Sequence, residues 1–125
     1  DVTGDATAYT IVFGTEEFDR GGDYNTSTGV FTAPVTGLYQ LSTTVQVRGV
    51  TSGMSDSTSY IYTSNGGVSI WQDESSGMSE NFMFNGSLLM DMDAGDTAYV
   101  RVDFRNGSKV VDVWTASKFS GALIA

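Results

Sequence analysis

Residues 23–47 read DYNTSTGVFTAPVTGLYQLSTTVQV, and this stretch decides the fold. Side chains alternate in character along its second half. One set comprises Tyr39, Leu41, Thr43, Val45 and Val47, and the other comprises Gln40, Ser42, Thr44, Gln46 and Arg48. Because successive side chains of a strand point to opposite sides, the pattern predicts a long strand with one buried face. The preceding residues predict a turn, a short strand and a corner at Pro34, which has no N–H to offer a sheet.

Similar alternation recurs along the rest of the chain, and no segment keeps a helical period. The further strand candidates are residues 9–13, 58–63, 67–72, 82–92, 98–104, 110–114 and 118–124. Asn-Gly pairs at Asn65 and Asn106 predict hairpin turns. Gly86 lies inside an alternating strand, where it predicts a bulge or the close approach of another backbone. Residues 1–125 are therefore expected to form one all-β domain, a sandwich or a barrel.

The composition excludes several classes of chemistry. The 125 residues include no Cys and no His, which rules out Cys-based or Ser-His catalysis and thiolate or imidazole metal sites. Fifteen acidic residues face six basic ones, giving a formal net charge of −9. Such a surface repels phosphate backbones and anionic lipids, so neither nucleic acid nor a membrane is an expected partner. Solubility explains the charge at least as simply as attraction for cations does.

Three apolar side chains fall on strand faces that should meet water. Met83 and Leu89 oppose the apolar face of the strand at 82–92, and Tyr99 opposes that of the strand at 98–104. Scattered exposure of single apolar residues is ordinary in soluble proteins. The alternative interpretation is that loops or a second subunit cover these three side chains.

The glycines and aromatic residues of the opening stretch resemble the signature of the complement C1q globular heads, a branch of the tumour-necrosis-factor-like jelly rolls. That family shows a Tyr-Asx pair and then Gly-x-Phe-x-x-Pro-x-x-Gly-x-Tyr. The matching residues here are Tyr24, Asn25, Gly29, Phe31, Pro34, Gly37 and Tyr39. Two later blocks agree with the family in order and spacing. They are Ala94-Gly95-Asp96 between two apolar strands, and Phe119-Ser120-Gly121 before the last strand.

The resemblance implies an antiparallel jelly-roll sandwich that assembles as a homotrimer through apolar contacts. It makes Met83, Leu89 and Tyr99 candidates for the trimer interface. Residues 2–13 look like the openings of such heads in bacteriophage and environmental structural proteins, and the Cys that precedes the proline in many animal members is Ala33 here. We therefore expect a bacteriophage, other viral or bacterial source.

Two acidic segments are candidates for calcium, which prefers oxygen ligands. Asp73, Glu74 and Glu80 lie in the loop before the strand at 82–92. This loop carries calcium-binding carboxylates in some family members, although a solvated acidic loop is the plainer interpretation. The run at 91–96 contains three Asp residues but lacks the closing Glu of an EF-hand loop. The resemblance makes this run a turn in which Asp96 bonds the backbone.

Trp71 and Tyr62 are candidates for ligand recognition, because aromatic residues at loop edges stack on sugars or anchor protein partners. The same residues could instead fill the core or a subunit interface. No pair of carboxylates is placed across a cleft by the sequence, and the family is not generally enzymatic, so no enzyme is predicted.

The function expected from the resemblance is a non-enzymatic, trimeric recognition head of a surface or virion structural protein. Its loops, such as 50–57 and 73–80, would bind a carbohydrate or protein receptor. No cofactor is expected, and calcium is the single candidate for one. The alternative is a purely structural domain that trimerises or caps a fibre, capsid or spore-coat protein without a ligand. Either role implies an extracellular or virion-surface location.

Overall fold

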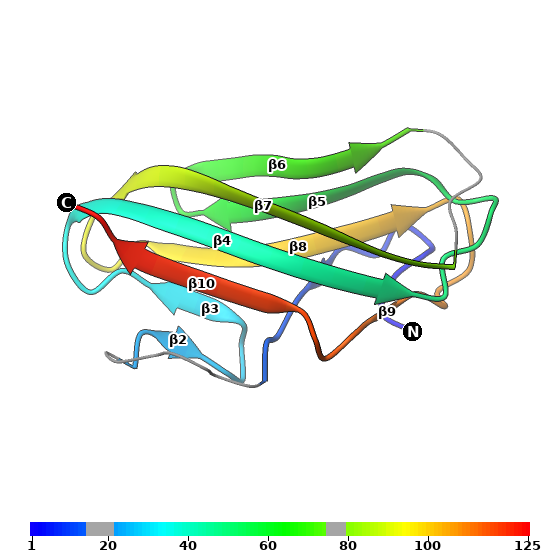
Figure 1. Ribbon diagram of the computed structural model, residues 1–125, viewed down its shortest axis with the longest axis horizontal. Helices are drawn as coiled ribbons and strands as arrows, with labels where there is room; N and C mark the ends of the chain where they lie inside the picture. Colours follow the sequence, from blue (N-terminus) through cyan, green and yellow to red (C-terminus); the bar gives the residue numbers. More distant parts are fainter. Residues whose placement is uncertain (15–21, 75–79) are drawn as a thin grey trace.

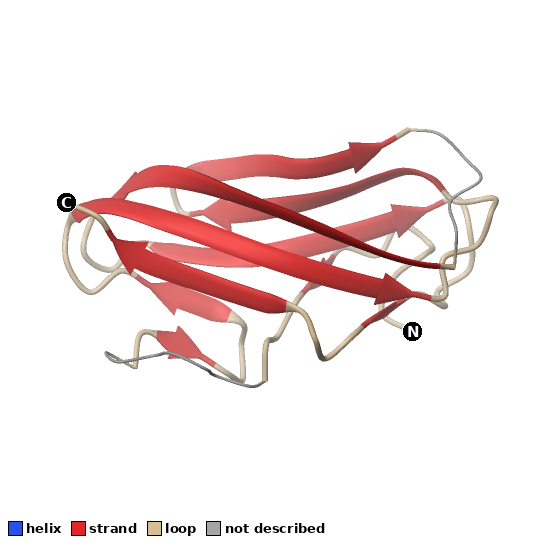
Figure 2. Ribbon diagram, viewed as in Figure 1, coloured by secondary structure: helices blue, strands red, loops and turns tan. Residues whose placement is uncertain are grey.

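The computed structural model describes residues 1–14, 22–74 and 80–125 as ten strands packed in two layers (Figure 1). The strands are β1 (Tyr9–Thr10), β2 (Tyr24–Asn25), β3 (Val30–Thr32), β4 (Gly37–Arg48), β5 (Ser55–Thr63), β6 (Gly66–Asp73), β7 (Asn81–Met92), β8 (Thr97–Arg105), β9 (Asp112–Val113) and β10 (Lys118–Leu123). Figure 2 shows strands and loops alone in the described residues. That part of the chain accordingly holds no helix long and apolar enough to span a membrane.

The two layers are antiparallel sheets of different size. The larger sheet has the order β2-β3-β8-β5-β6, with β1 also paired to β8. The smaller sheet has the order β10-β4-β7, with β9 also paired to β4. Strands that neighbour each other in sequence often lie in different sheets, such as β3 and β4, or β7 and β8 (Figure 1). The antiparallel jelly-roll sandwich expected from the sequence is confirmed.

The strands β4 and β7 are the two longest strands of the smaller sheet. Their pairing runs without a register shift from Gly37 opposite Met92 to Arg48 opposite Asn81. Gly86 lies in the middle of this ladder, so the prediction of a bulge is wrong. A Cβ on Gly86 would lie 2.8 Å from Cβ of Ile70 in the other sheet, so a side chain makes the close approach.

The core lies between the sheets and confirms the alternation of the opening stretch. The buried residues of β4 are Tyr39, Leu41, Thr43, Val45 and Val47. The Tyr39 ring packs against Phe31, with ring centroids 5.8 Å apart. Its hydroxyl donates to the carbonyl oxygen of Val35 at 2.6 Å and so ties the chain just after the Pro34 corner to the core.

Gly29 shows why the signature needs a glycine before β3. Its φ is +78°, and an added Cβ would lie 2.4 Å from the carbonyl oxygen of Ile11. Both the left-handed backbone and the close neighbouring carbonyl therefore exclude a side chain. The turn is held further by Asn25, whose side-chain oxygen accepts from the N–H of Ser27 at 2.8 Å.

The turn from β7 to β8 is organised by Asp96. One carboxylate oxygen accepts from the N–H of Asp93 at 2.8 Å and from the side-chain amide of Asn65 at 3.0 Å. The Asp93 hydrogen bond is the main reason why the pKa of Asp96 lies below its ordinary value. Gly95 in this turn has a φ of +94°. These contacts agree with the turn interpretation of residues 91–96.

The two predicted Asn-Gly hairpins have different outcomes. Asn65 lies in the tight turn that joins β5 to β6, where Thr63 pairs with Gly66. Asn106 has a left-handed φ of +65°, but the chain after it leaves the larger sheet. The next strand, β9, pairs with β4 in the other layer, so the hairpin predicted at Asn106 is wrong.

Candidate recognition surfaces

The outer face of the smaller sheet is almost uncharged over its central rows. We call it the β4–β7 face. It comprises Gln40, Ser42, Thr44, Gln46, Met83, Asn85, Ser87, Leu89, Lys118, Ser120 and Ala122. Met83 and Leu89 are 59% and 60% exposed, and the residues between them are small and polar. An open hollow of about 310 Å³ lies over this middle zone, where the side chains are small.

The residues predicted for a trimer interface do not all lie together. Met83 and Leu89 both belong to the β4–β7 face. Tyr99 lies on β8, opposite Tyr62 of β5, on the outer face of the larger sheet. One flat contact could therefore cover Met83 and Leu89 but not Tyr99.

The outer face of the larger sheet carries an aromatic cluster that we call the tyrosine–arginine patch, formed by Tyr60, Tyr62, Tyr99 and Arg101. Tyr62 pairs with Tyr99 across β5 and β8, and Tyr60 pairs with Arg101. The rings of Tyr62 and Tyr99 stack with centroids 5.5 Å apart and planes 14° apart. Tyr60 lies 5.3 Å from Tyr62, and all four side chains are half-buried. Strand pairing thus gathers three phenols and one guanidinium on a flat surface.

Arg101 is held by rings rather than by a carboxylate. Its guanidinium carbon lies 5.0 Å from the Tyr62 centroid and 5.3 Å from that of Tyr99. One terminal nitrogen donates a long hydrogen bond of 3.4 Å to the Tyr99 hydroxyl, and Nε is buried without a hydrogen-bond partner. Among the described residues no carboxylate pairs with Arg101, whereas Arg105 is 3.0 Å from Asp103. That ion pair raises the pKa of Arg105.

Gly67 of β6 makes room for the Tyr62 ring. It lies opposite Tyr62, and an added Cβ would lie 2.7 Å from Cε1 of that ring. Any larger residue at position 67 would displace the ring and disturb its stacking on Tyr99. The patch therefore depends on a glycine as well as on its aromatic residues.

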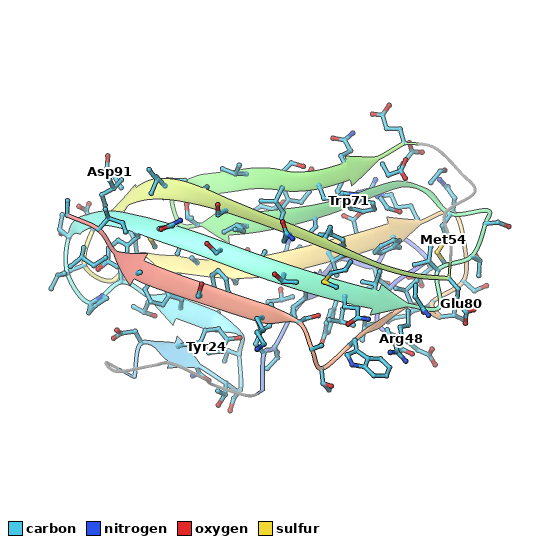
Figure 3. The ribbon with its side chains drawn as sticks, in the orientation of Figure 1. Tyr24, Arg48, Met54, Trp71, Glu80 and Asp91 are labelled. Carbon is cyan, nitrogen blue, oxygen red and sulfur yellow. The ribbon has the colours of Figure 1, made fainter. Side chains whose placement is uncertain are left out.

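Trp71, the other residue predicted for recognition, lies against the core (Figure 3). Its ring stacks on Phe84 of the opposite sheet, with centroids 4.9 Å apart and planes 9° apart. It also lies 5.7 Å from Phe104. These contacts give Trp71 the packing role that the sequence left open as its alternative.

The residues predicted for calcium border a gap in the described chain. Asp73 ends β6, and Glu74 accepts a hydrogen bond from the Gln72 side chain at 2.8 Å. Glu80 precedes β7 at one end of the sandwich, with Asp91 at the other end (Figure 3). Residues 75–79 of the predicted loop lie outside the described residues. No three carboxylates of residues 1–14, 22–74 and 80–125 come together as metal ligands, and the calcium site stays a prediction.

A second hollow, of about 670 Å³, lies at one end of the sandwich. Three residues that line it, Ala6, Asp56 and Asn106, have left-handed backbones with φ between +54° and +72°. Local contacts account for this arrangement, since the Asn106 amide donates to the Ser55 hydroxyl at 2.7 Å. Asp5 accepts a hydrogen bond from the Thr7 hydroxyl, which lowers the pKa of its carboxyl. We therefore interpret this hollow as a feature of the loop structure and not as a ligand site.

Sequence reasoning missed Tyr60 and Arg101. The sequence does contain a signal, because the pairs Tyr60-x-Tyr62 and Tyr99-x-Arg101 each place two such residues on one face of a strand. Only the register between β5 and β8 brings the two pairs together. That register is a long-range property, so the signal becomes visible only in the fold.

Two antiparallel layers with this strand order define the jelly-roll class of sandwiches. The chain belongs to the C1q domain family, whose model matches residues 1–124. The family expected from the signature is therefore confirmed.

Solved structures agree with this assignment at the level of the fold. The globular domain of zebrafish complement 1qA protein superposes with a TM-score of 0.72 at 19% sequence identity. The alignment covers 100% of this chain and 91% of the zebrafish chain. No curated protein sequence matches the chain. At 19% identity the zebrafish structure supports the fold alone and does not bear on the expected viral or bacterial source.

Proposed function

We propose that this C1q domain is a non-enzymatic, homotrimeric recognition head displayed outside the cell or on a virion, and that it binds a carbohydrate or protein receptor. The observation that carries the proposal is the contrast between the two outer faces of the sandwich. One face is nearly uncharged and exposes Met83 and Leu89, and the other presents a tyrosine–arginine patch. The first chemistry suits self-association, and the second suits a ligand.

The charge of the chain favours the β4–β7 face for self-association. Three chains carry 3 × −9 = −27 formal charges, so a contact between acidic faces would be repulsive. The central rows of the β4–β7 face contain one charged residue, Lys118, and no carboxylate. The exposed Met83 and Leu89 add apolar area that water would leave on assembly. Trimerisation through this face then leaves the tyrosine–arginine patch outward.

A trimer strengthens a weak ligand site through avidity. Three copies held rigidly engage a multivalent surface with much higher effective affinity than one copy does. A glycan array and a cell-binding assay with the trimeric protein test the recognition role. Saturable binding to a glycan or to a cell-surface protein supports it. Clean negatives in both assays would instead favour the structural role of trimerising or capping a fibre, capsid or spore-coat protein.

Calcium binding at Asp73, Glu74 and Glu80 is part of the proposal. Its support is the position of these carboxylates at the two borders of one loop. Calcium should raise the melting temperature and EDTA should lower it, since a ligand that binds only the folded state stabilises it. The triple variant with Asp73→Asn, Glu74→Gln and Glu80→Gln should lose the response. An equal response to magnesium, or none to either ion, would rule out a calcium site.

A further inference from the structure

We infer that the tyrosine–arginine patch binds a saccharide that carries a carboxylate. The inference rests on the proposed recognition function and names the ligand class and its place. That place is the outer face of β5 and β8, a sheet surface, whereas the sequence pointed to the loops at the ends of the sandwich.

The charge of Arg101 is the first argument. In a chain of net charge −9, this guanidinium lies against two rings and has no carboxylate partner among the described residues. A guanidinium offers several N–H donors in one plane, which matches a carboxylate geometrically. Nε is already buried without an acceptor, so the terminal nitrogens are the donors left for a ligand. A single carboxylate would supply the missing counter-charge.

The aromatic residues are the second argument. Tyr60, Tyr62 and Tyr99 combine apolar ring surface with three hydroxyl groups within one cluster. A sugar has the same mixed character, because its C–H faces pack on rings while its hydroxyls exchange hydrogen bonds with phenols. Because Gly67 has no side chain, position 67 of β6 does not crowd the Tyr62 ring. The patch therefore offers both kinds of contact beside the charge of Arg101.

The size of the patch argues for a small ligand. A stable protein interface buries about 800 Å² on each partner around an apolar centre. Here all four residues are half-buried, and the exposed Met83 and Leu89 lie on the opposite face of the sandwich. An extended polyanion such as nucleic acid would meet the repulsion of the whole acidic chain. One sugar ring with one carboxylate meets the local charge without that penalty.

The test is an NMR titration of the ¹⁵N-labelled protein with glucuronic acid and N-acetylneuraminic acid. Glucose and galactose are the matched neutral sugars, and sodium acetate is the matched carboxylate. We expect saturable shifts of the amides around Tyr60, Tyr62, Tyr99 and Arg101 with at least one acidic sugar. Glucose, galactose and acetate at the same concentration should give much smaller shifts there.

Variants separate the patch from general electrostatics. Arg101→Gln should weaken binding about tenfold or more, because it removes a charge-assisted hydrogen bond. Arg101→Lys keeps the charge but loses the planar fork, so an intermediate loss is expected. Lys109→Gln removes one positive charge from an exposed residue of the segment between β8 and β9, outside the patch, and should leave the affinity unchanged. The amide spectrum of each variant reports whether it is folded.

Several results would overturn the inference. They are shifts confined to other surfaces, equal shifts with acetate alone, equal binding of neutral sugars, and full affinity in folded Arg101→Gln. If the protein still binds cells or a different glycan class in those cases, the recognition function stands and only the patch assignment fails. If it binds neither acidic sugars nor cells, the recognition function fails as well.

Discussion

Tyr62 and Tyr99 stack on each other from opposite positions of two paired strands, with ring planes only 14° apart. Aromatic pairs of this kind contribute about 0.5–1.5 kcal/mol beyond the area they bury. A double-mutant cycle with Tyr62→Leu and Tyr99→Leu, measured by urea unfolding, should give a coupling energy of about 1 kcal/mol. The control cycle pairs Tyr62→Leu with Trp114→Leu and should be additive, since Trp114 lies against Arg48 at the smaller sheet. Additivity in the tyrosine cycle would show that the stack is not formed in solution.

The packing role of Trp71 in β6 can be tested against the recognition role predicted from the sequence. Its ring stacks on Phe84 and closes the gap between β6 and β7. Trp71→Ala should lower the free energy of unfolding by about 3 kcal/mol, because it leaves a cavity between the sheets. If the free energy of unfolding falls by less than about 1 kcal/mol, Trp71 contributes little to packing and is again a candidate for ligand recognition. Urea unfolding followed by far-ultraviolet circular dichroism measures the change without using the tryptophan signal.

The sequence predicts strands well because burial with a period of two is local. The alternation of β4, β7 and β8 locates these strands to within about two residues and places Met83 and Leu89 on the outer face. Family blocks then supply the jelly-roll topology. The local pattern does not show which strand pairs with which.

Tyr99, Ile70 and Trp71 show the consequence of missing strand partners. In the sequence, Tyr99 and Met83 both lie on the strand face that opposes the apolar one. In the fold, the strand of Tyr99 belongs to the larger sheet and that of Met83 to the smaller sheet. The pairing of β5 with β6 has a register shift between Ser59 and Tyr60. The irregularity lets adjacent Ile70 and Trp71 both pack against the core, which simple alternation would forbid. The patch is missed for the same reason, because the register between β5 and β8 brings Tyr99 and Arg101 beside Tyr62.

Gly29 allows a matched test of the family signature. Gly29→Ala should lower the free energy of unfolding by about 3 kcal/mol, through a strained left-handed backbone and a clash with the carbonyl oxygen of Ile11. Gly95 has a similar positive φ but nothing within 4 Å of an added Cβ. Gly95→Ala should therefore cost only about 1 kcal/mol. Equal losses in the two variants, by urea unfolding, would mean that the clash at Gly29 is absent.

The Asp96 turn should make stability depend on acid pH. Because hydrogen bonds lower its folded pKa below the ordinary 3.8, this carboxylate stabilises the fold above that value. The contribution is lost as the pH falls through the lower folded pKa. Asp96→Asn should thus be less stable than the wild type at neutral pH, and the gap should narrow as the pH drops below 3.8. A constant gap in urea midpoint across this range would show that the ionised form of Asp96 adds nothing.

The central claim of a trimer built on the β4–β7 face is tested most directly by the native mass in solution. Light scattering should give three times the chain mass of 13.3 kDa for the wild type. Leu89→Asp places a carboxylate in the proposed contact and should yield a folded monomer. Val12→Asp, at an exposed position beside the larger sheet, should remain a trimer. A wild-type mass of one chain, or a Leu89→Asp variant that stays trimeric, would contradict the account.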